Sequence, residues 1–237
     1  MPLYRVVSEE DQPDFVLAFE SLSGFFVDEP TAEKALLEGI GRAADAPSVT
    51  VDDAVIEVLG DSGKAIGEYY LGRLELRPKN ISRAPDGSIS LEVRWGGVPY
   101  PHAQEIWARW SRGSILPREW MQYPTAQHRD WMHVVQNAWF TSGKNALRYG
   151  TGDIVIDGRG LSSEASFYCA IGEAANGPGG YFGSNLDALE DCLRNGSVSG
   201  HRYSVVWNAV ETSRRVLGED FVTAVMEIFG ENRVAVR

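Results

Sequence analysis

From residue 153 onward, short apolar runs of strand type alternate with longer segments of helical periodicity, and this alternation constrains the fold more than any other feature. DIVID (153–157) and YSVVW (203–207) are typical of buried strands, and two helical patterns separate them. Two more helical patterns precede the closing RVAV at 233–236. Parallel neighbours in a sheet need long crossovers, which helices provide. We therefore predict an α/β domain with a short three-stranded parallel sheet over residues 153–237.

Polar residues mark where the first two of these helices begin. Ser162 or Ser163 can accept a hydrogen bond from the first turn of one helix, which Asn176-Gly177 would end. Ser184 can cap the next helix in the same way. Three leucines at helical spacing are expected to form its buried side: Leu186, Leu189 and Leu193.

The residues before this domain predict a separate α+β domain of hairpins and helices over 1–145. Leu3–Ser8 and Asp14–Glu20 suggest one hairpin, and a second is expected from VIEVLG and IGEYYLGRLEL around the turn DSGK. Thr31 can cap a short helix that would end near Gly41. Further strand and helix patterns follow: ISLEVRW as a strand, then AQEIWARW and AQHRDWMHVVQNAWF as helices. A linker is expected at 141–152.

Composition and charge limit the classes of function. With 43% apolar residues the chain can bury a core, and no apolar run is long enough for a membrane span, so we expect a cytoplasmic protein. The formal charge of −11 comes from 22 basic and 33 acidic residues, which disfavours nucleic acid or anionic lipid as a partner and favours a basic protein. Cys169 and Cys192 lack metal-type spacing, so we expect buried free thiols.

The residues give no support for an enzyme, and no cofactor or metal is expected. His128 and His133 are five residues apart, a spacing that does not bring them onto one helical face, so both are interpreted as surface or partly buried histidines. Most tryptophans fall at helical spacing and are expected to lie in the core. They are Trp95, Trp107, Trp110, Trp120, Trp131 and Trp139.

The segment with the most chemical content is YFGSNLDALEDCL, residues 181–193. Asp187 and Asp191 are four residues apart and therefore share one side of a helix, with Glu190 beside them. A phosphate-binding loop is disfavoured, because no Lys or Arg occurs between Arg159 and Arg194 and the carboxylates would repel an anion. A solvated acidic face and a protein-binding face both remain open.

This segment resembles the signature of the barstar family of intracellular ribonuclease inhibitors. In that family a tyrosine-rich turn, a glycine, an asparagine and LDALxDCL follow one another in this order. DIVIDGRGL is similar to the family's first strand and turn, YSVVW to its second strand with Trp207 at the core tryptophan, and AVMEIFGE to its last helix. The resemblance covers residues 153–237, and we recognise no family for residues 1–150.

The resemblance implies a protein that occludes the basic active site of a ribonuclease, either the cell's own secreted nuclease or a toxin against which it gives immunity. Asp191 would mimic the central phosphate, and Asp187 would pair with a flanking base. Tyr181 would be an aromatic anchor, and Gly183 would let the backbone approach the partner. The residues that the resemblance places at the partner are Tyr181, Gly183, Asn185, Asp187, Glu190, Asp191 and Glu231.

This chain also departs from the family pattern. Glu190 stands where the family's type member has a tryptophan, and a second interface tryptophan is replaced in the neighbourhood of Gly196. Glu231 aligns with a further acidic contact, but the stretch that follows it is shortened. The sequence therefore leaves a second hypothesis open, a regulatory or scaffold protein whose barstar-like domain binds a partner other than a nuclease. It does not define the oligomeric state.

Overall fold

The computed structural model of the chain describes residues 3–8, 17–29, 34–40, 49–77, 80–83, 85, 88–198 and 203–237. These residues divide into two compact units. Met1–Gly113 is the N-terminal unit, and Ser114–Arg237 is the C-terminal unit.

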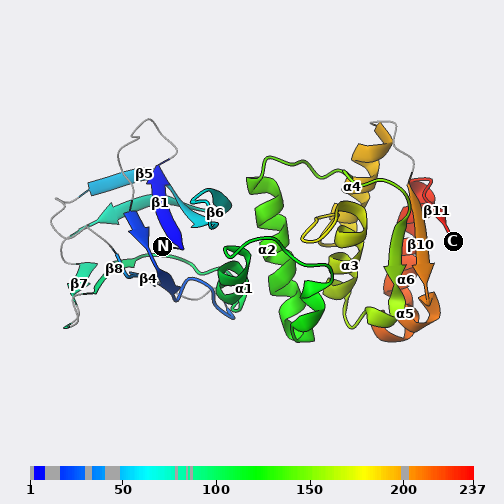
Figure 1. The fold of residues 1–237 in the computed structure, drawn as a ribbon, viewed down its shortest axis with the longest axis horizontal. Coiled ribbons are helices and arrows are strands. Elements are labelled where there is room, and N and C mark those ends of the chain that lie inside the picture. The colour runs from blue at the N-terminus through cyan, green and yellow to red at the C-terminus, as the bar shows by residue number, and fades with distance from the viewer. Residues whose placement is uncertain are drawn as a thin grey trace. The chain divides into compact units, whose positions relative to one another are not determined.

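The N-terminal unit contains two antiparallel four-stranded sheets and one helix among its described residues (Figure 1). One sheet has the strand order β2-β1-β5-β6 and the other β3-β4-β8-β7. The elements are β1 (Tyr4–Ser8), β2 (Leu17–Phe19), β3 (Ser21–Ser23), β4 (Ala35–Glu38), β5 (Val49–Leu59), β6 (Ala65–Leu76), β7 (Ile81–Arg83), β8 (Ile89–Val93) and α1 (Ala103–Trp110).

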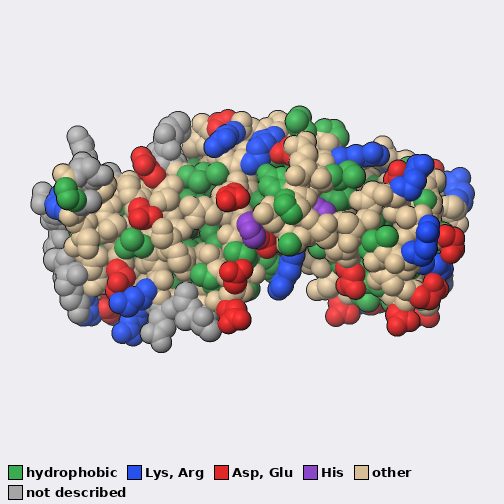
Figure 2. Space-filling model, turned by 90° about the horizontal axis from the view of Figure 1, so that it is seen from below, with side chains coloured by type: hydrophobic (Ala, Val, Ile, Leu, Met, Phe, Trp, Pro, Cys, Tyr) green, Lys and Arg blue, Asp and Glu red, His purple; other side chains and the backbone are tan. Residues whose placement is uncertain are grey.

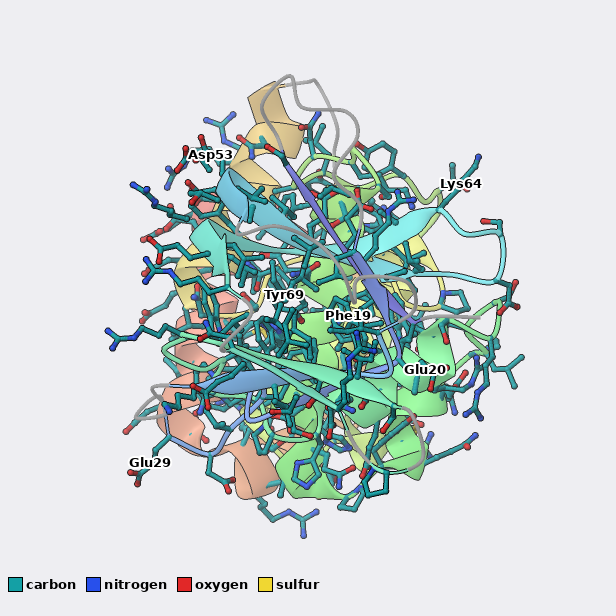
Figure 3. The ribbon with its side chains drawn as sticks, turned by 90° about the vertical axis from the view of Figure 1, so that its left-hand side faces the viewer. Phe19, Glu20, Glu29, Asp53, Lys64 and Tyr69 are labelled. Carbon is teal, nitrogen blue, oxygen red and sulfur yellow. The ribbon has the colours of Figure 1, made fainter. Side chains whose placement is uncertain are left out.

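Aromatic side chains form the core of this unit. Tyr4 stacks on Phe19 with ring centroids 5.4 Å apart, and the buried Trp107 of α1 donates its Nε1–H to Tyr69 Oη at 2.7 Å. Figure 3 shows Phe19 and Tyr69 inside the unit, whereas Lys64 projects from the turn between β5 and β6. The helix is thus fixed to the strands by a buried polar contact as well as by apolar packing.

Most sequence expectations for this unit are confirmed. The pairing of β1 with β2 and of β5 with β6 gives the two expected hairpins, and β8 and α1 also form as expected. The helix expected after Thr31 is wrong, because the described part of that segment is strand β4. Ala35 and Leu37 face the core while Leu36 and Glu38 are less buried, which is the alternation of a strand.

The C-terminal unit has a three-stranded parallel sheet in the order β11-β10-β9, which confirms the expected α/β class (Figure 1). An antiparallel-sheet unit with a helix precedes it, again as expected. The elements of the C-terminal unit are α2 (His128–Thr141), β9 (Ile154–Asp157), α3 (Glu164–Asn176), α4 (Leu186–Val198), β10 (Ser204–Asn208), α5 (Val210–Leu217), α6 (Glu219–Glu231) and β11 (Ala235–Val236). Short 3₁₀ turns occur at Glu119–Gln122, Thr125–Gln127 and Gly158–Gly160.

One face of the parallel sheet holds the core of this unit. Ile154 and Ile156 are fully buried, whereas Val155 between them is 54% exposed. Trp207 of β10 stacks on Phe167 of α3 at 5.2 Å, and its Nε1–H donates to the buried Ser213 Oγ at 3.0 Å. The ring of the predicted core tryptophan is therefore packed inside the unit, and its Nε1–H has a hydrogen-bond acceptor there.

Helix α3 has the boundaries that its polar residues predict. Ser163 is the N-cap, and a capping box joins it to Ser166, while Gly177 at φ +82° ends the helix. Buried Cys169 of α3 lies against α2, with Sγ 3.9 Å from the carbonyl oxygen of His128. Both cysteines are free, and burial raises the thiol pKa of each.

Residues 114–152 belong to the same compact unit as the parallel sheet. Helix α2 packs against α3, and Gly150 N donates to the carbonyl oxygen of Ala175 at 3.2 Å. The segment expected to be a linker is thus hydrogen-bonded to α3. The expected division into an α+β domain at 1–145 and a barstar-like domain at 153–237 stays a prediction, as does the expectation that 153–237 folds alone.

Among the described residues, no helix combines the length and the apolar character that crossing a membrane would require.

Candidate functional site

The acidic helix α4 begins one residue later than the sequence predicts. Asn185, not Ser184, is the capping residue, because Asn185 Oδ1 accepts a hydrogen bond from Ala188 N at 2.7 Å. Ser184 is instead hydrogen-bonded to the side chain of Tyr181. Asn185 is exposed, so a residue that the resemblance places at the partner also fixes the start of the helix.

Gly183 is buried in the turn just before α4. Its φ is +96°, and a Cβ at this position would lie 2.7 Å from the backbone Cα and N of Leu189. Only glycine allows both this conformation and this approach. The structure thus gives Gly183 a function inside the unit, which is to let the turn pass close to α4. Its expected contact with a partner stays a prediction.

One side of α4 is anchored in the core. Leu189, Cys192 and Leu193 have no exposed surface, whereas Leu186 is only partly buried. The expected leucine stripe is therefore confirmed at two of its three positions. This anchoring fixes the rotation of the helix and hence the side on which its carboxylates lie.

The other side of α4 carries the three predicted carboxylates in different environments. Asp187 is exposed and forms no ion pair within the described parts of the chain. Glu190 is half-buried and pairs with Arg194, which also reaches Asp191 with Nη1 3.5 Å from Oδ1. The hydrogen bond to Glu190 raises the pKa of Arg194. Arg194 thus neutralises part of the acidic side, a feature that the sequence reading missed.

Asp187 interacts electrostatically with Tyr168 of α3. Burial raises the pKa of Tyr168, and the negative charges of Glu164 and Asp187 add to the shift. Asp187 also occupies the first turn of α4, where the helix dipole stabilises a negative charge. The face of the C-terminal unit that Figure 2 draws carries acidic and basic side chains next to one another.

The structure places Tyr181 beneath Phe140, the penultimate residue of α2. Only 3% of Tyr181 is exposed, and the two ring centroids are 5.3 Å apart. Asn176 Nδ2 donates to the carbonyl oxygen of Tyr181 at 2.6 Å, which fixes the loop between α3 and α4. The proposed aromatic anchor is therefore covered by a side chain from outside the barstar-like segment.

Residues 142–150, which join α2 to β9, are held along α3 and α4 by hydrogen bonds. Tyr149 N donates to Asn176 Oδ1 at 2.6 Å, and Asn195 Nδ2 of α4 reaches the carbonyl oxygen of Ala146 at 3.5 Å. Phe140 and Tyr149 remain 44% and 53% exposed. The sequence reading missed these two residues. Nothing local predicts that Phe140 packs on Tyr181, forty-one residues later, or that Tyr149 is hydrogen-bonded to Asn176, twenty-seven residues later.

The remaining positions of interest lie at the ends of helices. Gly196 is buried in the last turns of α4, where a Cβ would lie 1.5 Å from Tyr203 Oη. The ring of Tyr203 occupies the space that any side chain at 196 would need, which explains why a tryptophan does not fit there. Glu231 is exposed at the C-terminal end of α6, which packs against α4.

Two features outside α4 carry no site of their own. His128 is buried, with Nε2 3.1 Å from the carbonyl oxygen of Tyr123, and no group of three or more metal-type side chains occurs in the described ranges. A hollow of about 420 Å³ beside β9 is lined by two arginines and two carboxylates, so its charges balance. One of these pairs is Arg159 with Asp157 at 2.9 Å.

The geometry of the C-terminal unit is that of a parallel α/β domain presenting a carboxylate-bearing helix. Residues 153–236 match the family model described as Barstar (barnase inhibitor), so this segment is a Barstar domain. The family is one of inhibitors rather than of catalysts. No curated protein and no solved structure gave a match.

Proposed function

We propose that this protein binds and occludes the basic active site of a ribonuclease through α4 and the loop before it. The observation that carries the proposal is the Barstar domain at 153–236, whose core holds α4 so that Asp187 and Asp191 are exposed. A site that binds phosphodiesters is built from basic side chains, which carboxylates can fill. The inhibitor would act in the cytoplasm, on the cell's own nuclease or on an incoming toxin.

Barnase, which the family description names, is the probe for the test. The full-length chain is expected to inhibit RNA cleavage by barnase at a one-to-one ratio. Asp191→Ala should weaken binding by more than about 2 kcal/mol, because basic groups of the nuclease are then buried without a partner. Asp220→Ala is the matched control, since Asp220 is exposed on α6. Equal, small effects of both substitutions would contradict the assignment of α4 as the binding face.

Salt dependence tests the electrostatic part of the proposal. A steered complex associates faster than the ~10⁵–10⁶ M⁻¹s⁻¹ of unsteered docking, and screening acts over about 10 Å at 0.1 M salt. The association rate constant should therefore fall steeply as salt rises, while dissociation changes less. If association does not respond to salt, the carboxylates of α4 are only a solvated face.

A second candidate is a regulatory protein whose Barstar domain binds a partner other than a nuclease. It is favoured by the burial of Tyr181 under Phe140, which withdraws the aromatic ring that the inhibitor family presents. This candidate predicts that RNA cleavage continues at full rate in a saturating excess of the protein.

A further inference from the structure

We propose that Phe140 and Tyr149 form an aromatic flank of the binding face, so that the segment preceding the Barstar domain contributes directly to partner binding. This inference rests on the proposed function, because it places the flank beside α4 in the same interface. The two residues lie outside the segment that matches the family. They would replace the aromatic contacts that this chain lacks at Glu190 and Gly196.

The position of the flank follows from its contacts with the Barstar domain. Phe140 packs on Tyr181, the residue that the resemblance assigns to the interface, at 5.3 Å between ring centroids. Tyr149 N donates to Asn176, whose side chain also donates to the carbonyl oxygen of Tyr181. Both aromatic residues are thus connected to the loop that leads into α4.

The flank is also held in place before any partner arrives. Trp139 Nε1 donates to the carbonyl oxygen of Asn145 at 2.8 Å, and the Trp139 ring lies 5.6 Å from that of Tyr149. Asn145 N donates to Tyr149 Oη at 3.1 Å. Ordering a flexible loop costs binding free energy, and these contacts reduce that cost.

Exposure and chemistry favour a protein partner for this flank. Phe140 and Tyr149 are among the few large apolar or aromatic side chains that stay exposed in the described ranges. Aromatic residues beside a charged surface are typical of the side chains that contribute most to protein–protein affinity. The neighbouring carboxylates of α4 select a basic partner. The surface therefore fits a nuclease whose basic cleft is bordered by an apolar rim.

The test measures binding of barnase to the full-length chain by titration calorimetry. Phe140→Ala and Tyr149→Ala are each expected to raise the Kd at least about tenfold. Tyr70→Ala is the matched control, because Tyr70 is an aromatic residue that is 57% exposed and lies in the N-terminal unit. Thermal unfolding of each variant shows whether the fold is retained. Tyr149→Phe keeps the ring and loses only the hydrogen bond from Asn145 N, so it should raise the Kd less than Tyr149→Ala does.

The outcomes separate this inference from the function on which it rests. If Asp191→Ala weakens binding and neither flank substitution does, the inference is overturned while the inhibitor proposal stands. Tighter binding by Phe140→Ala would show that Phe140 hinders the partner instead of contacting it, which also overturns the inference. If the parent chain does not bind barnase, the proposed function fails and the inference fails with it.

Discussion

Replacing Gly183 by alanine distinguishes a residue that shapes the protein from one that contacts the partner. Gly183 has φ +96°, and an added Cβ would lie 2.7 Å from two backbone atoms of Leu189. A non-glycine residue in such a backbone conformation costs about 1–3 kcal/mol. Overpacking against atoms that cannot move away costs about 1–3 kcal/mol more. We therefore expect Gly183→Ala to lower the free energy of unfolding by about 2–6 kcal/mol.

Gly218→Ala is a closely matched control. Gly218 has φ +94° and lies in the same unit, but an added Cβ there meets no atom within 4 Å. This variant should lose only the conformational part, about 1–3 kcal/mol. At about 4 °C per kcal/mol for a unit of this size, Gly183→Ala should melt roughly 4–12 °C below Gly218→Ala.

The assay is differential scanning calorimetry of both variants, followed by barnase titration at a temperature where both are folded. The reasoning would be refuted if the two variants melted together while Gly183→Ala alone bound more weakly. In that case Gly183 acts at the partner surface, as the family resemblance implies.

Two more predictions concern buried polar groups. Ser213→Ala should lower the free energy of unfolding by about 1–3 kcal/mol in urea titrations, because the buried Trp207 Nε1–H loses its acceptor; an unchanged midpoint would mean that another acceptor takes over. Burial lowers the pKa of His133 to about 4, so between pH 6.5 and pH 4 the unfolded chain binds a proton that the folded chain does not. The free energy of unfolding should consequently fall by up to about 3 kcal/mol on acidification through this range. His133→Gln should flatten this pH dependence; an equally steep dependence in that variant would show that other groups cause it.

The fold of the C-terminal unit could be predicted because its signals are local. Strands β9 and β10 are short apolar runs, and Ser163 and Gly177 bound α3 with the chemistry that helix ends require. The family resemblance was carried by one ungapped segment, and the match over 153–236 bears it out. The cap of α4 was misplaced by one residue because Ser184 and Asn185 are both capping types, and only the contact with Ala188 separates them.

The failures came where distant residues decide the structure. The pattern after Thr31 fits a helix, but β4 pairs with β8 more than fifty residues later, and those hydrogen bonds outweigh a weak local preference. Likewise, Tyr181 is buried and packs on Phe140, forty-one residues earlier. Spacing predicts that the three carboxylates of α4 share one side of the helix, and the family resemblance implies their function. Their pairing with Arg194 depends on side-chain geometry that spacing does not contain.

The close fit of Gly196 against Tyr203 also restricts which substitutions this helix can accept, and in what order. Any side chain at 196 would overlap the hydroxyl of Tyr203, whose ring packs on Phe182 at 5.7 Å. A change at 203 to a smaller residue must therefore come first, and by itself it would open a cavity. The effects of substitutions at 196 and 203 therefore depend on each other. Selection for new partners is expected to act instead on residues 140–149, where a substitution does not first require a destabilising change in the core.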